Sequence, residues 1–396
     1  MSRRPLVLVV GTRPEAIKLA PVALAAARSG SLDPVILATG QHDHLVVDAL
    51  ASFGLAVDVA LPLDRGYGSS QPQLLARLLP SIEAALDRID PAAVLVQGDT
   101  ASAYSGAMAG TLRQTPVAHL EAGLRSFDKA NPFPEESYRR LIAAVADLHL
   151  PPTPWAAANL RAEGVPGHAI VCTGNTVVDA AQLIGARARA APDPLVSSIR
   201  RAGRRLVLVT VHRRENWGAP LRSILAAVAR VVEGSPDIEV VLPVHPNPVV
   251  RSAVHEVLGD RPRVHVIEPL DYAGFLAHLS AATLVLSDSG GVQEEAPTFG
   301  VPVLVLRDTT ERPEAVQAGS AELVGTDQEH IVQRARHLLL DEAARQEMAQ
   351  IANPFGDGTS GRRAVGALTW LVDGGVQPPS WEPQPGDPVA RGPVPA

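Results

Sequence analysis

Residues 6–21 read Leu-Val-Leu-Val-Val-Gly-Thr-Arg-Pro-Glu-Ala-Ile-Lys-Leu-Ala-Pro. The apolar run ends at Gly11, Thr12 can cap a helix, and Pro14 stands where the first helical turn tolerates a missing amide hydrogen. Unpaired amides at a helix start attract anions, and the guanidinium of Arg13 adds a permanent positive charge. The stretch therefore predicts a strand, a tight turn, and a helix start that can hold a phosphate group.

A second turn of this kind lies far along the chain. The apolar run 284–286 is soon followed by Asp-Ser-Gly-Gly-Val-Gln-Glu-Glu at 288–295, so a Ser-Gly-Gly turn opens another helix. Two helix starts suited to anions, so far apart in sequence, predict a phosphate-bearing ligand held between two lobes.

Short apolar runs alternate with Ala-rich helical stretches along most of the chain. Such alternation predicts an α/β fold, with parallel sheets covered by helices on both faces. With 396 residues the chain exceeds what one hydrophobic core usually supports, so we expect two domains. The strand-like runs are 6–10, 34–37, 93–96, 117–120 and 148–150 in a first series, and 206–211, 240–242, 264–267, 284–286 and 303–306 in a second.

Composition and charge exclude several classes of protein. A net charge of −7 argues against general binding of nucleic acid or of a membrane surface. A single cysteine, Cys172, excludes an internal disulfide and a cysteine-rich metal site. His42 and His44 lack a third ligand in a recognised spacing, so we expect no metal. Because no apolar run approaches the ~18 residues of a membrane span, we expect a cytoplasmic protein.

Polar residues gather directly after the predicted strands. In open parallel sheets, ligands bind beyond the carboxyl ends of the strands, and these residues stand at such ends. We therefore expect ligand binding by Gln41 and His42, Gly98 to Thr100, Glu121, His212 to Asn216, His245 to Asn247, and Ser289 to Gly291.

Several of these acidic residues also have a purely structural explanation. An Asp after a strand, such as Asp99, often caps a helix, and Glu135 can form a helix-start ion pair with Arg139, four residues later. Glu121 is harder to explain in this way, because a carboxylate flanked by small and apolar residues is costly to bury unpaired.

The basic run that begins at His212 also has two interpretations. It can be a solvated surface, although its place after an apolar strand favours contact with a diphosphate. His245, directly before Pro246, can be a simple loop residue. The turns lack the Gly-x-Gly-x-x-Gly and Gly-x-x-x-x-Gly-Lys-Ser/Thr patterns, which disfavours nicotinamide and P-loop chemistry. We expect no cofactor.

Taken together, these segments resemble the non-hydrolysing UDP-N-acetylglucosamine 2-epimerases, and the resemblance runs from Gly11 to about Arg362. In the first half it is carried by 11–18 (Gly-Thr-Arg-Pro-Glu-Ala-Ile-Lys), 39–42 (Thr-Gly-Gln-His), 98–100 (Gly-Asp-Thr), 119–125 (His-Leu-Glu-Ala-Gly-Leu-Arg) and 134–136 (Pro-Glu-Glu). In the second half it is carried by 173–179 (Thr-Gly-Asn-Thr-Val-Val-Asp), 212–216, 288–297, 307–314 and 353–358.

The resemblance implies a GT-B architecture, in which two Rossmann-like, doubly wound parallel-sheet domains hold the active site in the cleft between them. It implies an N-terminal domain over 1–178 with the catalytic carboxylates and a C-terminal domain over 179–365 that binds UDP. A helix over 366–375 would return to the N-terminal domain. The composition of the Pro-rich segment 376–396 predicts a disordered tail. The family also suggests a homodimer.

The resemblance implies reversible conversion of UDP-N-acetylglucosamine to UDP-N-acetylmannosamine. The C2 hydrogen of the sugar is not next to a carbonyl carbon, so it cannot leave as an ordinary acidic proton. If the bond from C1 to UDP breaks early, positive charge at C1 acidifies that hydrogen, and elimination gives UDP and a 2-acetamidoglucal. UDP then adds back while a proton reaches the opposite face of C2.

This route needs carboxylates near C2 and a firm hold on the departing diphosphate. By resemblance, the catalytic residues are Asp99, Glu121, Glu135 and His212. The substrate-binding residues are Arg13, Lys18, Arg139, Asn175, Phe275, Ser289, Gly290, Gly291, Glu295 and Arg312. Glu295 would hold the ribose hydroxyls, and Phe275 would pack near the uracil. A second, regulatory substrate site would be formed by Gln41, His42, Arg213 and His245.

The sequence leaves three alternatives open. The same fold and first half-reaction could admit water and release free N-acetylmannosamine and UDP. A GT-B glycosyltransferase would use the same UDP-binding domain but would need an acceptor pocket, and the carboxylates would then lack an evident purpose. A catalytically inactive nucleotide-sugar sensor is suggested by His44 and Tyr138, which replace residues usual in the family.

Overall fold

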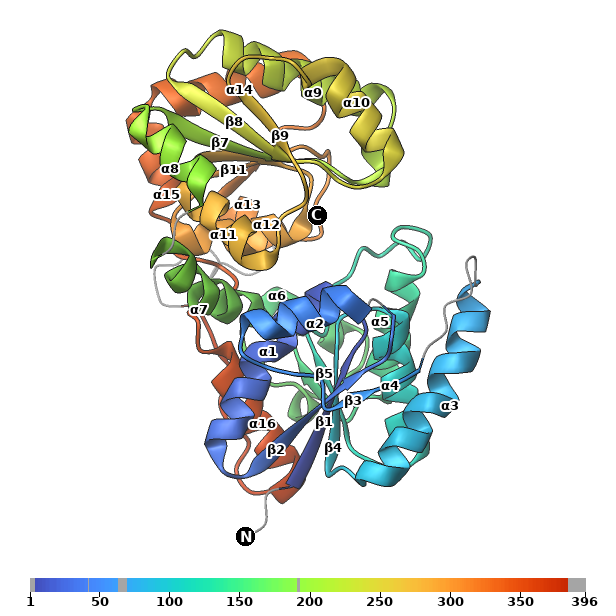
Figure 1. Ribbon diagram of the computed structural model, residues 1–396. Coiled ribbons are helices and arrows are strands. Elements are labelled where there is room, and N and C mark those ends of the chain that lie inside the picture. The colour runs from blue at the N-terminus through green and yellow to red at the C-terminus, as the bar shows by residue number, and fades with distance from the viewer. Residues whose placement is uncertain (1–3, 42, 63–69, 191–192, 384–396) are drawn as a thin grey trace. The chain divides into compact units, whose positions relative to one another are not determined.

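The computed structural model describes residues 4–41, 43–62, 70–190 and 193–383, and the chain forms two compact units. The first unit, here called the N-domain, contains residues 4–180 and 355–383 of the described chain. The second unit, here called the C-domain, contains residues 181–354. Each unit has its own sheet and its own covering helices (Figure 1).

The N-domain is built on a sheet of six parallel strands. The strands are β1 (Arg4–Val10), β2 (Leu32–Ala38), β3 (Val59–Ala60), β4 (Ala93–Gln97), β5 (Val117–Leu120) and β6 (Leu148–Leu150). They lie in the order β3-β2-β1-β4-β5-β6, which is the doubly wound order of Rossmann-like domains. Strands β4, β5 and β6 are buried along their whole length, as expected for apolar runs without polar alternation.

Helices surround this sheet. They are α1 (Arg13–Ser29), α2 (Asp43–Ser52), α3 (Gln71–Ile89), α4 (Ala101–Leu112), α5 (Glu135–Val145), α6 (Pro154–Ala162), the short turn η1 (Gly167–Ala169) and α16 (Ser360–Asp373), while α7 (Thr176–Ala190) continues into the C-domain. Helix α4 lies close to the strands because two of its positions have no side chain. A Cβ at Gly106 would meet Val9 and Val96 at 3.0 Å, and one at Gly110 would meet Val117 at 2.6 Å.

The C-domain repeats this plan. Its strands are β7 (Arg205–Thr210), β8 (Ile238–Pro243), β9 (Val264–Ile267), β10 (Ala282–Ser287), β11 (Val303–Val305) and β12 (Ala321–Leu323). Its helices and short turns are α8 (Pro194–Arg201), η2 (Arg214–Asn216), α9 (Ala219–Glu233), α10 (Pro248–Leu258), α11 (Tyr272–Ala281), α12 (Gly290–Glu295), η3 (Ala296–Phe299), α13 (Pro313–Ala318), α14 (Gln328–Leu340) and α15 (Glu342–Ala349). The parallel order is β12-β11-β10-β7-β8-β9.

Both sheets reverse their winding next to their first strand. In the N-domain the reversal lies between β1 and β4, and in the C-domain it lies between β7 and β10. At such a switch point the two neighbouring turns diverge and leave room for a ligand beyond the carboxyl ends of the strands. The predicted fold class, α/β with two Rossmann-like domains of the GT-B type, is confirmed.

The C-terminal part of the chain returns to the N-domain earlier than the sequence predicted. The C-domain ends at Pro354, whereas we expected residues up to 365 to belong to it. The backbone carbonyl of Phe355 accepts a hydrogen bond from the Asn175 amide at 2.7 Å. The carboxylate of Asp179 then receives the amides of Ser360 and Gly361, at the start of α16. Helix α16 therefore begins six residues before the expected 366 and packs against α1 (Figure 1).

The expected disordered tail, 376–396, is described as far as residue 383. In that part Trp381 donates its amide to the Cys172 carbonyl at 2.7 Å, and Ser380 accepts the Cys172 amide at 3.0 Å. The Arg363 guanidinium lies 5.6 Å from the centre of the Trp381 ring. Residues 376–383 thus have defined contacts with the N-domain, and the rest of the expected tail lies outside the described residues. Across the described ranges, the helices are all too short or too polar to cross a membrane.

Candidate active site

The turn after β1 is held by one buried carboxylate. Glu15, in the first turn of α1, accepts the amides of Gly11 and Thr12 at 3.0 and 2.6 Å through its Oε2 atom. Oε2 also accepts the Thr12 hydroxyl at 2.8 Å, and Oε1 accepts the Thr100 hydroxyl at 2.6 Å. The Gly11 and Thr12 amides are therefore bound by an internal carboxylate, and Arg13 remains the predicted phosphate-binding residue of this turn.

Glu15 is unusual because its charge is deeply buried. Its side chain is 1% exposed, and burial raises its pKa to about 7 although the four donors act in the opposite direction. Close packing fixes the same turn, since a Cβ at Gly11 would lie 2.0 Å from the Ser102 hydroxyl oxygen. Glu15 is not among the predicted site residues, although a Thr followed three residues later by Glu is the pattern of a capping box.

Glu121 lies directly after β5 and has several partners. Its carboxylate accepts hydrogen bonds from the Lys18 ammonium and from the Gln97 side-chain amide, and Asn175 Nδ2 lies 3.4 Å from Oε1. The burial that the sequence predicted to be costly is thus offset by a cation and an amide. Glu121 has a backbone φ of 63°, a left-handed conformation that is unfavourable for a non-glycine residue.

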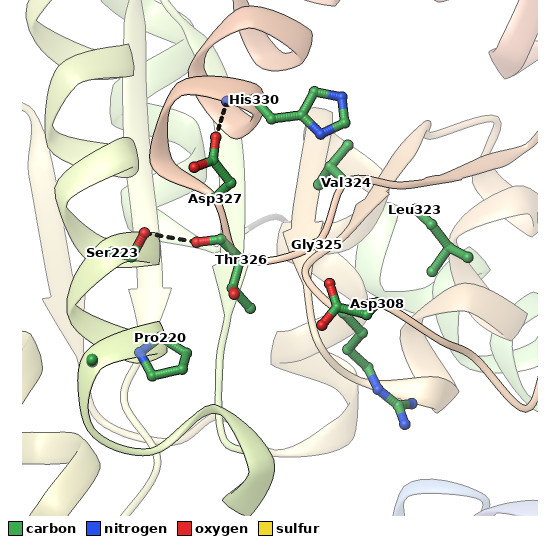
Figure 2. A pocket seen from close by; sticks show the side chains of 11 residues that line it. Pro220, Ser223, Asp308, Leu323, Val324, Gly325, Thr326, Asp327 and His330 are labelled. Carbon is green, nitrogen blue, oxygen red and sulfur yellow. Dashed lines mark hydrogen bonds between the residues drawn. The ribbon is translucent and has the colours of Figure 1, made fainter.

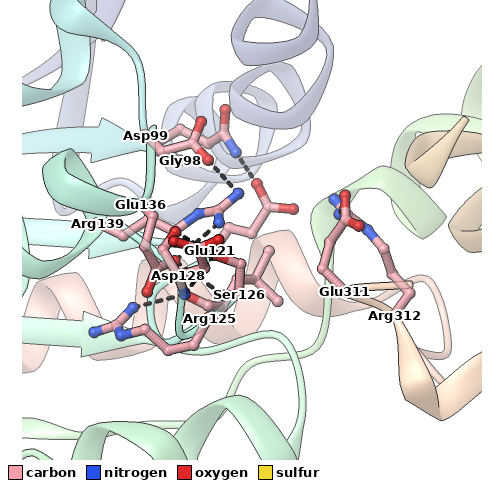
Figure 3. A network of polar contacts seen from close by, with 12 residues as sticks. Gly98, Asp99, Glu121, Arg125, Ser126, Asp128, Glu136, Arg139, Glu311 and Arg312 are labelled. Atoms are coloured by element: carbon pink, nitrogen blue, oxygen red, sulfur yellow. Dashed lines mark hydrogen bonds and ion pairs between the residues drawn. The ribbon is translucent and has the colours of Figure 1, made fainter. Parts of the chain in front are cut away.

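Asp99 forms an ion pair instead of capping a helix. The cap of α4 is Thr100, whose hydroxyl accepts the Ala103 amide at 3.0 Å. The Asp99 carboxylate lies 2.6 Å from Nη2 of Arg139, on α5 (Figure 3). The structural interpretation of Asp99 as a helix cap is therefore wrong.

Arg139 is held from the other side by Glu136 and not by Glu135. Arg139 Nη1 lies 3.2 Å from Glu136, whose fully buried carboxylate also accepts the Ser126 amide and the Arg140 guanidinium. Burial alone would raise the pKa of Glu136, but the Ser126 amide and the two arginines outweigh it and leave the pKa below its ordinary value. Glu135 has one buried carboxyl oxygen, Oε2, that finds no hydrogen-bond donor in the described part of the chain.

His119 holds the backbone directly before Asp99. Burial lowers the pKa of this histidine to about 3, so the ring is neutral at pH 7. Its Nε2 lies 2.8 Å from the carbonyl of Gly98, which fits donation of the ring N–H to that oxygen. Gly98 has φ 70°, and a Cβ there would lie 3.7 Å from Glu121 Oε2. The residue before Asp99 is thereby fixed next to Glu121.

The remaining predicted residues of the N-domain are placed around these turns. Arg13 opens α1, half buried. Gln41 follows β2, and its Oε1 accepts the Ser102 hydroxyl at 2.7 Å. His42 lies outside the described residues, and the neighbouring His44 is exposed on α2.

In the C-domain, the turns after β7 and β10 are joined by Asp288. This buried carboxylate accepts the amides of His212 and Arg213 and the side-chain amide of Asn216, at 2.9 to 3.1 Å. Burial would raise the pKa of Asp288, but its contact with His212 and the backbone amides outweigh burial and lower it. His212 also stacks on His245, with ring centres 5.8 Å apart and planes 17° from parallel.

A cluster of arginines and glutamates lies behind the Ser289-Gly290-Gly291 turn. Arg312 donates to Glu294 at 2.9 Å and to Glu311 at 2.7 Å, and Arg213 donates to the same Glu311 at 3.1 Å. Burial alone would raise the pKa of Glu311, but its arginine neighbours outweigh burial and lower it strongly. A Cβ at Gly290 would lie 2.9 Å from the guanidinium carbon of Arg312, so a larger residue here would displace that guanidinium.

The other predicted nucleotide-binding residues lie on or next to α11 and α12. Ser289 precedes α12, and its amide donates to the Ser287 hydroxyl at 3.0 Å. Gly291 and Glu295 are on α12, with Glu295 buried at its last position, and Phe275 is half buried on α11. Asp288, Glu294 and Glu311 lie within segments that carry the family resemblance but are not among the predicted site residues.

One cavity, of about 670 Å³, lies elsewhere in the C-domain (Figure 2). It opens beyond the carboxyl ends of β11 and β12, near the start of α9, and its wall includes Asp308, Thr326, Asp327 and His330. None of the predicted site residues lines it. Among the residues that the structure describes, no three His, Cys, Asp or Glu side chains gather in a way that could hold a metal ion.

Comparisons with known proteins agree with the resemblance of the motifs. The sequence pattern of the family described as UDP-N-acetylglucosamine 2-epimerase matches residues 24–369. The UDP-N-acetylglucosamine 2-epimerase of Bacillus subtilis is 42% identical over 372 residues, which cover 93% of this chain and 96% of that protein.

Solved structures give the same result. The UDP-GlcNAc 2-epimerase of Neisseria meningitidis, bound to UDP-GlcNAc, aligns with a TM-score of 0.86 at 35% identity, covering 92% of this chain and 99% of that one. The enzyme of Methanocaldococcus jannaschii, in complex with UDP-GlcNAc and UDP, aligns with a TM-score of 0.77 at 33% identity and the same coverage. The chain therefore belongs to the UDP-N-acetylglucosamine 2-epimerase family, whose members are enzymes of the isomerase class.

Proposed function

We propose that the protein interconverts UDP-N-acetylglucosamine and UDP-N-acetylmannosamine by eliminating UDP and adding it back. The observation that carries this proposal is the buried Glu121 carboxylate, which Lys18 and Gln97 orient beside the Asp99–Arg139 ion pair. A set of oriented carboxylates suits proton transfer at carbon. Relatives whose structures contain UDP-GlcNAc support the choice of substrate.

The first half-reaction breaks two bonds of the sugar. The C1–O bond to the diphosphate cleaves with both electrons leaving on UDP, and a carboxylate takes the proton from C2 as the C1–C2 double bond forms. In the second half-reaction a UDP oxygen attacks C1, and a proton is delivered to C2 from the opposite face. No net oxidation occurs, so the route needs no nicotinamide.

Asp99, Glu121 and Glu135 are the proposed acid and base groups. Lys18 and Arg139 fix two of these carboxylates, so little reorganisation is needed when the substrate reacts. Glu135 differs, because its buried Oε2 is left without a donor in the described part of the N-domain. An oxygen in that state is suited to receive a hydrogen bond or a proton from a bound sugar.

The C-domain supplies the proposed hold on UDP. His212, Ser289 and the Gly290–Gly291 turn would bind the diphosphate together with Arg13, while Glu295 would hold the ribose and Phe275 would pack near the uracil. Asp288 fixes the backbone of His212, and Arg312 backs the Gly290 turn, which supports a rigid nucleotide site. Asn175 would complete the sugar site beside Glu121.

The sensor alternative loses part of its basis. Tyr138 is 6% exposed, belongs to the apolar core between α3, α4 and α5, and stacks on Tyr104 with ring centres 5.1 Å apart. Its hydroxyl donates to the Gln71 side chain at 3.2 Å. Tyr138 therefore takes part in helix packing, and the Arg139–Asp99 pair is present next to it in sequence.

The regulatory substrate site, a homodimer and a cytoplasmic location complete the proposal. Gln41, His42, Arg213 and His245 would form the second substrate site. Among them, Arg213 is ion-paired with Glu311, and His245 stacks on His212. A sigmoidal dependence of rate on UDP-N-acetylglucosamine would support the second site, and light scattering of the purified protein gives the oligomeric state.

The test of the main proposal is incubation with UDP-N-acetylglucosamine in deuterium oxide. We expect UDP-N-acetylmannosamine with solvent deuterium at C2, read by mass spectrometry and NMR. Product without deuterium would argue against proton exchange with solvent at C2. Release of mostly free N-acetylmannosamine and UDP would instead identify a hydrolysing enzyme, and the absence of turnover would favour the sensor.

A further inference from the structure

Glu15 is a buried carboxylate to which the proposed chemistry assigns no step. Its two oxygens accept four hydrogen bonds, three from the turn after β1 and one from the turn after β4. These strands are neighbours at the point where the N-domain sheet reverses its winding. One side chain thus joins the two turns that border the switch point.

Both turns also start a helix. Thr12 precedes α1, and Thr100 caps α4 by accepting the Ala103 amide at 3.0 Å. Because the positive ends of two helices face one carboxylate, Glu15 takes the place that a phosphate group has in many Rossmann-like domains.

Helix capping alone does not require a buried charge. Helix α3 begins in the same way with Ser70, whose amide donates to the neutral side chain of Gln73 at 2.9 Å. At Glu15, by contrast, burial raises the pKa to about 7, and no cation of the described chain forms an ion pair with the carboxylate. A neutral Gln would cap α1 without this penalty, so the carboxylate has a further use.

We propose that Glu15 is a positioning residue that fixes Arg13 and Asp99 relative to each other. Glu15 accepts hydrogen bonds from Thr12 and Thr100. Arg13 directly follows Thr12, and Asp99 directly precedes Thr100, so each is the neighbour of a residue that Glu15 fixes. The inference rests on the proposed function, in which Arg13 binds the diphosphate and Asp99 belongs to the acid and base groups. Glu15 takes no part in the bond-making steps and acts only by holding the two turns that carry Arg13 and Asp99.

The test uses three variants: Glu15→Gln, Thr100→Val and the double variant that combines these two changes. Thr100→Ser serves as the control. Gln keeps the size of the side chain but provides one acceptor oxygen in place of two, and Val removes the Thr100 hydroxyl while Ser retains it. We expect kcat to fall at least about tenfold for Glu15→Gln and for Thr100→Val, as for other displaced reacting groups. KM and the affinity for UDP should change less than about threefold, and Thr100→Ser should retain the wild-type kcat.

The double variant separates positioning from general loss of stability. If both single changes break the same link, the double variant should be no slower than the slower single variant. Multiplied losses, a wild-type kcat for Glu15→Gln, or equal rates for Thr100→Val and Thr100→Ser would overturn the proposal. Gln73→Ala, which removes the corresponding bond at α3, should leave kcat unchanged and is the matched control.

The wild-type protein in the same assay tests the proposed function separately. Turnover by the wild type, with no effect of the variants, rejects the role of Glu15 and leaves the epimerase proposal standing. If the wild type does not turn over, the epimerase proposal fails, and thermal unfolding then decides the link. Shifts in Tm that simply add in the double variant would show that Glu15 and Thr100 do not act together.

Discussion

The carboxylate of Asp288 lies 3.2 Å from Nδ1 of His212 and accepts the backbone amide of the same residue at 3.0 Å. It therefore fixes the position of the His212 ring and favours the tautomer in which Nδ1 carries the hydrogen. The second ring nitrogen, Nε2, is the one that would face the diphosphate in the proposed function.

Asp288→Asn should lower kcat by about 100-fold, because an amide can present its N–H to His212 and favour the wrong tautomer. The expected measurement is steady-state epimerisation, together with UDP affinity by calorimetry. Asp327→Asn, at the cap of α14 in the same domain, is the control and should behave as wild type. Equal activity of the two variants would contradict the role assigned to Asp288.

Glu121→Gln should abolish turnover while UDP still binds. The amide cannot take a proton from C2, and it would place an N–H near the Lys18 ammonium or the Gln97 amide. We expect a loss of kcat of at least about 1,000-fold, within the range for removal of an acid or base group. Glu239→Gln is a matched control, since Glu239 is also buried and paired with Arg204 and His265. Loss of UDP affinity in Glu121→Gln would point to a binding role.

Gly11→Ala should destabilise the N-domain. The new Cβ would lie 2.0 Å from the Ser102 hydroxyl oxygen and 2.8 Å from that of Thr39, two residues that also hydrogen-bond each other. Overpacking of this kind costs about 1–3 kcal/mol in the free energy of unfolding. Gly366→Ala, on α16, meets open space and should stabilise the protein by up to about 1 kcal/mol. Urea denaturation measures both, and a Gly11→Ala protein as stable as wild type would refute the packing argument.

His119 should make the protein less stable in acid. Its folded-state pKa of about 3 lies below the ordinary value of 6.5, so the unfolded chain binds a proton that the folded chain rejects. Stability is lost as the pH falls below 6.5, by about 2 kcal/mol between pH 7 and pH 5. Glu15 acts in the opposite direction. Because its folded-state pKa is raised to about 7, the folded chain binds a proton before the unfolded chain does, and stability rises as the pH falls from 7 to 4.5.

Comparing the pH dependence of stability in wild type and in His119→Gln isolates the contribution of His119 from that of Glu15 and other titrating groups. Gln keeps a donor for the Gly98 carbonyl but does not titrate, so the variant should lose about 2 kcal/mol less than wild type on going from pH 7 to pH 5. Denaturation curves at the two pH values give this difference. Parallel losses in both proteins would show that His119 is not responsible.

The fold could be predicted from local patterns because the strands are short, apolar and followed by polar turns. The runs at 93–96 and 117–120 correspond to β4 and β5, and the polar residues after them, Asp99 and Glu121, form the centre of the candidate site. Local sequence was sufficient here because the carboxyl ends of neighbouring parallel strands lie side by side.

The pairing of side chains could not be predicted in the same way. Glu135 and Glu136 are adjacent in sequence, and helical spacing to Arg139 permits either pair. The structure pairs Arg139 with Glu136, whose buried carboxylate also accepts the amide of Ser126 from outside the helix. The contact of Glu15 with the Gly11 and Thr12 amides, in the turn expected to bind an anion, was also not predicted. The limit at 365 was also misplaced, because the amide of Asn175 and the carboxylate of Asp179 hold residues 355–361 to the N-domain from far away in sequence.

The return of α16 to α1 makes the C-domain an insertion within the N-domain. Residues 181–354 form one uninterrupted unit, whereas the N-domain needs segments from both sides of it. During synthesis the later domain can therefore complete its core first, while the earlier one waits for residues 360–373 to leave the ribosome. A nascent chain whose residue 354 has just left the ribosome should thus carry a finished C-domain and an unfinished N-domain, with the helix-facing surface of α1 still uncovered.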